Sequence, residues 1–133
     1  MTAVDMPHQS DLAGRRVLVI EDEYMISMFI TEALQDIGCE VVATADRIEP
    51  ALEKAKVESF DIAIVDVNLR GEQTHAVVDA LAERGKPFVI ATGYGTDGLP
   101  ERMSRSPRLC KPFMPDDLEK AMRLALQTTG ARA

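Results

Sequence analysis

The chain has 133 residues, of which 46% are hydrophobic and 28% are charged, a composition typical of one globular domain. Its 15 basic and 22 acidic residues give a net charge of -7, which argues against direct DNA binding because nucleic-acid readers usually carry a basic face. No apolar run approaches the roughly 20 residues that a membrane-spanning helix needs. The polar N-terminus has no secretion signal, so we expect a cytoplasmic protein without a membrane contact.

Short apolar runs alternate with amphipathic segments along the chain. The run at residues 16–20 precedes apolar residues spaced as on one helix face, and this helix should stop at Gly38. Residues 93–107 hold three glycines and two prolines, which predicts a loop with at most a short helix at residues 101–104. In chain order we expect strands at residues 16–20, 40–45, 61–65, 87–91 and 108–110, and helical stripes at residues 26–37, 48–55, 77–82 and 115–125.

Five apolar strands that alternate with helices indicate βαβ units and a parallel sheet covered on both faces. The predicted fold is an α/β three-layer sandwich, doubly wound, with the flavodoxin-like strand order 2-1-3-4-5. We expect one domain at residues 15–128, a flexible tail at 1–14 and a short tail at 129–133. Cys39 and Cys110 are isolated in the sequence and are expected to be buried, reduced thiols.

Polar residues follow four of the predicted strands. Glu21 and Asp22 follow the first, Asp66 the third, Thr92 the fourth and Lys111 the fifth. Strands one and three are neighbours in the predicted order, so the three carboxylates should share one crevice. Crowded carboxylates repel one another unless a cation intervenes, and Mg²⁺ prefers such oxygen ligands. With the lysine ammonium and the threonine hydroxyl, the set suits a carboxylate that accepts a phosphoryl group.

These residues, in this order at successive strand ends, resemble the receiver domain of two-component response regulators over residues 15–127. The resemblance implies that Asp66 is the phosphoacceptor and that the hydroxyl of Thr92 bonds the phosphoryl group. It also implies that Lys111 pairs with phosphoryl oxygens and that the Lys111–Pro112 peptide bond is cis, a minority state for X–Pro bonds. The implied Mg²⁺ ligands are Asp22, Glu21 through water, Asp66 and the backbone carbonyl of Asn68.

One position departs from the usual receiver pattern. Arg108 stands three residues before the lysine, where typical receivers carry the Tyr or Phe of their conformational switch. Residues 87–94, Pro-Phe-Val-Ile-Ala-Thr-Gly-Tyr, are similar to the signature of the FAT GUY receivers, with Ile90 in place of one Phe. That resemblance implies a stand-alone receiver in stress signalling with a kinase of the HWE class. We hypothesise that Tyr94 replaces the missing ring as phosphorylation orders its loop.

The resemblance implies a switch that accepts a phosphoryl group from a histidine kinase or phosphotransfer protein and then binds a protein partner. In the family the usual contact surface is the fourth helix, fifth strand and fifth helix, where Leu124 lies off the apolar stripe. Such a receiver catalyses only its own phosphorylation and dephosphorylation, so we do not expect an enzyme with free product turnover.

The same residues also admit four other interpretations. A phosphate sink would use the same site, and an aspartyl-phosphate phosphatase would need a carboxylate where Asn68 stands. A nucleotide or flavin domain is rejected because acidic residues 21–23 replace the phosphate loop. Asp22 by itself could also be a helix N-cap. Methionines in or beside the helical stripes are expected to pack in the core or at its edge: Met25, Met28 and Met122.

Overall fold

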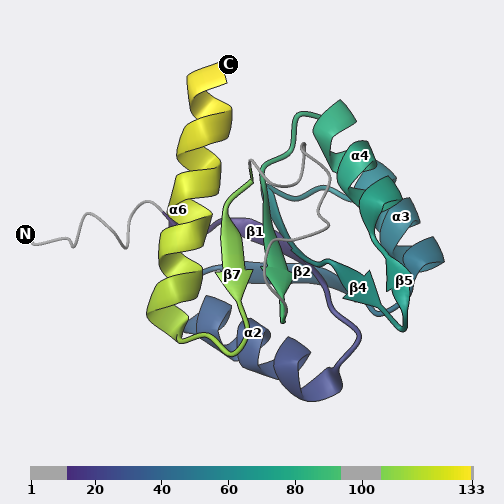
Figure 1. Cartoon of the computed structure of the whole chain (residues 1–133). Coiled ribbons are helices and arrows are strands. Elements are labelled where there is room, and N and C mark those ends of the chain that lie inside the picture. The colour runs from purple at the N-terminus through teal and green to yellow at the C-terminus, as the bar shows by residue number, and fades with distance from the viewer. Residues whose placement is uncertain (1–11, 94–105, 133) are drawn as a thin grey trace, which may run out of the picture.

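The computed structural model describes residues 12–93 and 106–132, and these form a parallel five-stranded sheet between two layers of helices (Figure 1). The strand order is β2-β1-β3-β6-β7, which confirms the predicted order 2-1-3-4-5 and the flavodoxin-like fold. The strands are β1 (Arg16–Ile20), β2 (Glu40–Ala45), β3 (Ile62–Asp66), β6 (Phe88–Thr92) and β7 (Arg108–Cys110).

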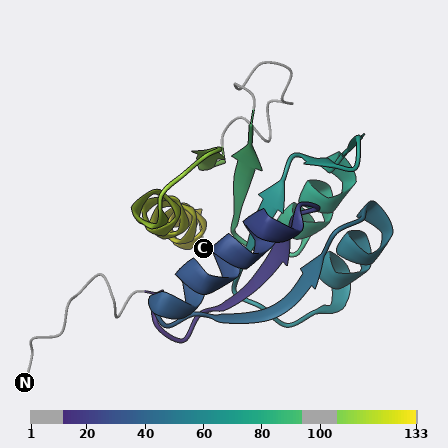
Figure 2. The same ribbon diagram turned by 90° about the horizontal axis from the view of Figure 1, so that it is seen from below.

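In the described part of the chain, two helices cover each face of the sheet (Figure 2). On one face lie α2 (Tyr24–Asp36) and α6 (Pro115–Arg132), and on the other lie α3 (Ile48–Val57) and α4 (His75–Glu83). Successive residues of a strand point to opposite faces, so β1 supplies both cores. Val17 and Val19 pack in the core under α2 and α6, whereas Leu18 and Ile20 pack in the core under α3 and α4.

The helices form where apolar residues recur at helical spacing. In α2 the buried residues are Ile30, Ala33 and Leu34, and in α6 Leu118 and Met122 are fully buried. Burying one such Leu or Ile side chain contributes roughly 1.5–3 kcal/mol relative to exposure. The buried apolar residues of each helix therefore determine which side of that helix packs against the sheet.

The boundaries of the packed domain in the sequence differ from the predicted ones. Leu12 is fully buried in the core of α2 and α6, and the amide of Gly14 donates to the carbonyl of Gly38 at 2.8 Å. Residues 12–14 therefore pack with the domain and do not belong to the expected tail 1–14. At the other end, α6 continues to Arg132 through most of the expected tail 129–133.

Three of the sulfur-containing residues discussed above are exposed. Cys39 is buried as predicted, but Cys110 at the end of the edge strand β7 is exposed, so that expectation was wrong. Met122 packs in the core, whereas Met25 is 74% and Met28 is 38% exposed. Both exposed methionines lie on the side of α2 that has no sheet to cover it, because the buried stripe occupies the other side.

The sequence analysis missed one element, an antiparallel hairpin between β3 and α4. Its strands are β4 (Asn68–Leu69) and β5 (Glu72–Gln73). The hairpin lies beside α3 in Figure 1. Tyr94 and the expected short helix at residues 101–104 lie outside the described residues. No helix in the described part of the chain is both long enough and apolar enough to cross a membrane.

Candidate functional site

The carboxyl ends of four adjacent strands bring the polar residues of the sequence analysis to one edge of the sheet. Glu21 directly follows β1, Asp66 ends β3, Thr92 ends β6, and Lys111 directly follows β7. The register aligns Asp66 with Ala91 of β6, and Thr92 with the last residue of β7. Because these strands are parallel and neighbouring, residues up to 90 positions apart in the sequence meet in one place.

Three carboxylates gather at this edge. One oxygen each of Glu21, Asp22 and Asp66 lies within 4.8 Å of the others. Glu21 and Asp66 are only 4% and 6% exposed, and Asp22 is partly exposed. The backbone orients two of the acids: the amide of Glu23 donates to Glu21 Oε2 at 3.1 Å, and the amide of Asn68 donates to Asp66 Oδ1 at 3.1 Å.

Lys111 connects two of these carboxylates. Its Nζ lies 2.9 Å from Glu21 Oε1 and 2.9 Å from Asp66 Oδ2. The backbone amide of Lys111 donates to the carbonyl of Thr92 at 2.8 Å, and the Lys111–Pro112 peptide bond is cis, as the resemblance implies. Burial works against the protonated lysine, but hydrogen bonds to Glu21 and Asp66 outweigh it and raise the pKa of Lys111. The ammonium therefore stays charged at neutral pH.

One ammonium does not balance three carboxylates. Burial raises the pKa of Glu21 to about 7, the charge of Asp66 acts in the same direction, and the hydrogen bond from Lys111 opposes both. A second positive charge would relieve this repulsion, and hard oxygen ligands on adjacent strand ends are the donors that Mg²⁺ prefers. The cluster of Glu21, Asp22 and Asp66 could therefore hold a metal ion.

The other predicted site residues lie at or near this edge. Thr92 is 2% exposed at the end of β6, beside Asp66 in the neighbouring strand. Asn68 uses its side-chain oxygen to accept the amide of Gly71 at 2.9 Å, and the metal-binding role of its carbonyl stays a prediction. Arg108 begins the edge strand β7 and is partly buried. The predicted switch residue Tyr94 lies outside the described residues.

Asp22 does not cap the helix that follows it. The N-cap position of α2 is Glu23, which makes no side-chain capping hydrogen bond. Instead, Asp22 Oδ2 accepts the backbone amide of Arg70, 48 positions away, at 2.8 Å. Sequence reasoning missed this partner. The available signal was Gly71, since glycine is favoured at the second central position of a two-residue hairpin turn.

Comparison with solved structures gives close fold matches. The solution structure of SdrG from Sphingomonas melonis Fr1 is 38% identical, covers 86% of this chain and 98% of its own, and has a TM-score of 0.76. The crystal structure of the response regulator PhyR from Brucella abortus is 27% identical, with a TM-score of 0.79, and covers 95% of this chain and 53% of its own.

Sequence comparison points the same way. The transcriptional regulatory protein PdtaR of Mycobacterium tuberculosis is 34% identical over 116 residues, and the match spans 84% of this chain but 57% of that protein. The family model described as the response regulator receiver domain matches residues 17–123, which includes the acidic cluster, Thr92 and Lys111. This chain therefore belongs to the response regulator receiver domain family of two-component signalling.

Proposed function

We propose that this chain is a phosphorylation switch in which Asp66 accepts a phosphoryl group from the phosphohistidine of a kinase or phosphotransfer protein. The observation that supports this most is the position of Asp66 within the acidic cluster, with Lys111 Nζ 2.9 Å from its Oδ2. The carboxylate of Asp66 is nearly buried, which limits its contact with water, and it lies at the carboxyl end of β3. Phosphoryl transfer asks mainly for such positioning and for charge neutralisation.

In the proposed step a carboxylate oxygen of Asp66 attacks phosphorus. The new O–P bond forms as the P–N bond to the donor imidazole breaks, and the imidazole leaves with the bonding electrons and takes up a proton. Lys111 neutralises negative charge on the phosphoryl oxygens, and the Thr92 hydroxyl donates to one of them. Hydrolysis of the aspartyl phosphate by water then returns the carboxylate and releases inorganic phosphate.

Glu21, Asp22 and Asp66, with the backbone carbonyl of Asn68, are the residues we assign to Mg²⁺. When bound, Mg²⁺ supplies positive charge that offsets the charge of the transferring phosphoryl group. The chain returns to its starting state only through its own dephosphorylation. We therefore propose a self-modifying switch and not an enzyme that turns over a free substrate.

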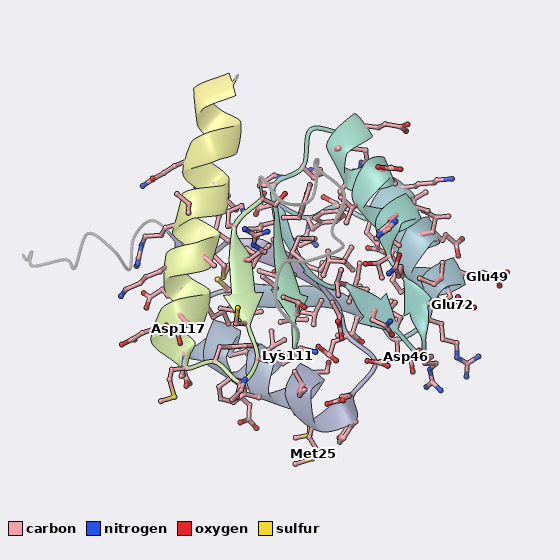
Figure 3. All side chains as sticks on the ribbon, in the orientation of Figure 1. Met25, Asp46, Glu49, Glu72, Lys111 and Asp117 are labelled. Atoms are coloured by element: carbon pink, nitrogen blue, oxygen red, sulfur yellow. The ribbon has the colours of Figure 1, made fainter. Side chains whose placement is uncertain are left out.

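A donor protein must bring its phosphohistidine to the strand ends. Exposed apolar residues lie beside the charged site there. Tyr24 and Met25 at the start of α2 are 73% and 74% exposed, and Met114 before α6 is 67% exposed. Figure 3 shows Met25 at the same end of the molecule as Lys111. An exposed apolar rim around a charged site fits a protein that binds there transiently.

For the output we propose a protein partner. PhyR from Bartonella quintana, an anti-anti-sigma factor, is 25% identical to this chain in a match that covers 94% of this chain and 53% of PhyR. Another PhyR, a stress response regulator, is 26% identical. With the signature at residues 87–94, these matches support a FAT GUY receiver in stress signalling whose donor is a kinase of the HWE class. The contact surface we propose includes β7 and α6, where Leu124 is 53% exposed.

The first test is the intact mass of the protein after incubation with acetyl phosphate, with and without Mg²⁺, beside an Asp66→Asn variant. We expect a gain of one phosphoryl group that needs both Mg²⁺ and Asp66. If acetyl phosphate does not react, the assay is repeated with phosphorylated histidine kinases, and no transfer there would refute the proposal. Phosphorylation without any change in partner binding would instead identify a phosphate sink.

A further inference from the structure

The hairpin between β4 and β5 carries a strained residue. Arg70 has φ 52° and Gly71 has φ 86°, so both central residues of this two-residue turn are left-handed. Turns of this type favour Asn-Gly or Gly-Gly, and a residue such as Arg costs roughly 1–2 kcal/mol in the left-handed region. Each strand has only two residues, and an isolated hairpin is marginally stable. Something outside the hairpin must hold it in place.

Two other loops hold Arg70. Its backbone amide donates to Asp22 Oδ2 at 2.8 Å, in the loop after β1. Its guanidinium donates to Asp46 after β2, through Nε to the backbone carbonyl at 3.3 Å and through Nη2 to Oδ2 at 3.1 Å. We call the guanidinium contacts to Asp46 the Arg70–Asp46 latch. A hollow of about 520 Å³ lined by Ile48 and Leu69, among others, lies beside the latch, and Leu69 itself packs in the core under α3 and α4.

The energy of the latch is small, but its geometry is specific. Both side chains are about half exposed, at 54% and 52%, and exposed ion pairs contribute on the order of 0–1 kcal/mol. Any effect of the latch on the site must therefore come from the position in which it holds the backbone of Arg70. The latch holds the amide that donates to the carboxylate of Asp22, an acid that the proposed function assigns to the metal.

We propose that Arg70 is a positioning residue for the metal site: the latch holds its strained turn, and its amide then orients the carboxylate of Asp22. This inference rests on the proposed function, because it assumes that Asp22 binds Mg²⁺. A charge-assisted hydrogen bond to one carboxylate oxygen removes rotational freedom from the side chain. Partners of this kind typically change metal affinity by about 10- to 100-fold.

Arg70→Gly is the decisive variant because electrostatics and positioning predict opposite results. Glycine keeps the amide and accepts the left-handed conformation without strain, but it populates other conformations about as readily, so without the guanidinium the latch no longer fixes the amide. Removing a positive charge near a cation site should strengthen Mg²⁺ binding by Coulomb's law. Loss of the positioning role should weaken Mg²⁺ binding by about 10-fold, the low end of the range for residues that hydrogen-bond to a metal ligand. Arg47→Gly is the matched control, since Arg47 lines the same hollow and carries the same charge.

Mg²⁺ affinity is measured by calorimetry, and the amide of residue 70 is followed by NMR in the metal-free protein. We expect weaker binding for Arg70→Gly, unchanged or slightly tighter binding for Arg47→Gly, and a smaller effect of Arg70→Gly when Asp46→Asn has already removed the charged latch partner. The resonance of the Arg70 amide should move in Asp46→Asn, which weakens the latch without touching the Asp22 carboxylate, whereas a latch that does not position the turn would leave this resonance unchanged.

The outcomes distinguish a failure of the positioning role of Arg70 from a failure of the proposed metal site. If the wild type binds Mg²⁺ and Arg70→Gly binds it equally well or more tightly, the positioning role is refuted and the metal site stands. If the wild type binds no Mg²⁺, the metal site itself is refuted, and the role of Arg70 falls with it. Circular dichroism of each variant checks that the fold is retained.

Discussion

Lys111 Nζ lies 2.9 Å from Asp66 Oδ2, although 45 residues separate the two in the chain. The same ammonium lies 2.9 Å from Glu21 Oε1, so one cation serves two nearly buried acids. In the protein without metal, Lys111 therefore limits the repulsion between carboxylates that the proposed reaction needs close together.

Replacing this lysine should destabilise the metal-free protein and also block phosphorylation. Breaking a buried ion pair by removing one partner typically costs about 3–5 kcal/mol, because the other charge is left buried. We expect Lys111→Met to lose ~3 kcal/mol in urea unfolding at pH 8, a loss that Mg²⁺ partly restores. Lys120→Met, on the exposed side of α6, is the matched control and should change stability by less than about 0.5 kcal/mol. Equal losses in both variants would contradict this role of Lys111.

Glu21 should make the stability of the metal-free protein depend on pH. Its pKa is raised from 4.5 to about 7 on folding, so between these values the folded state holds more proton than the unfolded state. Stability from this group is then fully present below pH 4.5 and is lost as pH rises through about 7. Glu21→Gln should therefore gain more stability relative to the wild type at pH 8 than at pH 5.

Urea unfolding at the two pH values, without Mg²⁺, measures the Glu21 effect. Glu23→Gln is the matched control, since this residue is exposed and its amide, not its side chain, contacts Glu21. A gain from Glu21→Gln that is the same at both pH values would show that Glu21 does not titrate in this range.

The two cysteines should differ in reactivity. Cys110 is exposed, whereas Cys39 is buried and its Sγ donates to the carbonyl of Leu12 at 3.3 Å. Burial also raises the pKa of Cys39 to about 11, so little of it is thiolate, the reactive form. We expect iodoacetamide to modify one thiol in the native protein and two in urea, as counted by mass spectrometry. Native modification that persists in Cys110→Ser would contradict the burial of Cys39.

Gly38 should be less replaceable than Gly85. Both have positive φ, at 91° and 69°, so alanine costs roughly 1–2 kcal/mol at either position. At Gly38 an added Cβ would also lie 3.3 Å from the backbone Cα of Ala13, whereas at Gly85 nothing lies within 4 Å. Thermal unfolding should show a larger loss for Gly38→Ala than for Gly85→Ala. Equal losses would mean that residues 12–14 do not pack against the turn.

The order of strands and helices and the residues at the strand ends follow from local sequence patterns alone. Apolar spacing is a local property, and each strand end is marked by a change from apolar to polar residues. Once the strand order was known, four polar residues could therefore be assigned to one edge of the sheet: Glu21, Asp66, Thr92 and Lys111. The strand order itself follows from general rules for doubly wound sheets.

The identity of the atoms that meet at that edge depends on how the folded chain packs. The sequence does not show that Lys111 contacts Glu21 as well as Asp66, or that Asp22 accepts an amide from a hairpin 48 residues away. The exposure of Cys110 and the burial of Leu12 also depend on what packs above them. These contacts join residues distant in the chain, and side-chain rotamers and loop geometry set them after the sheet has formed. No local pattern of residue types encodes them.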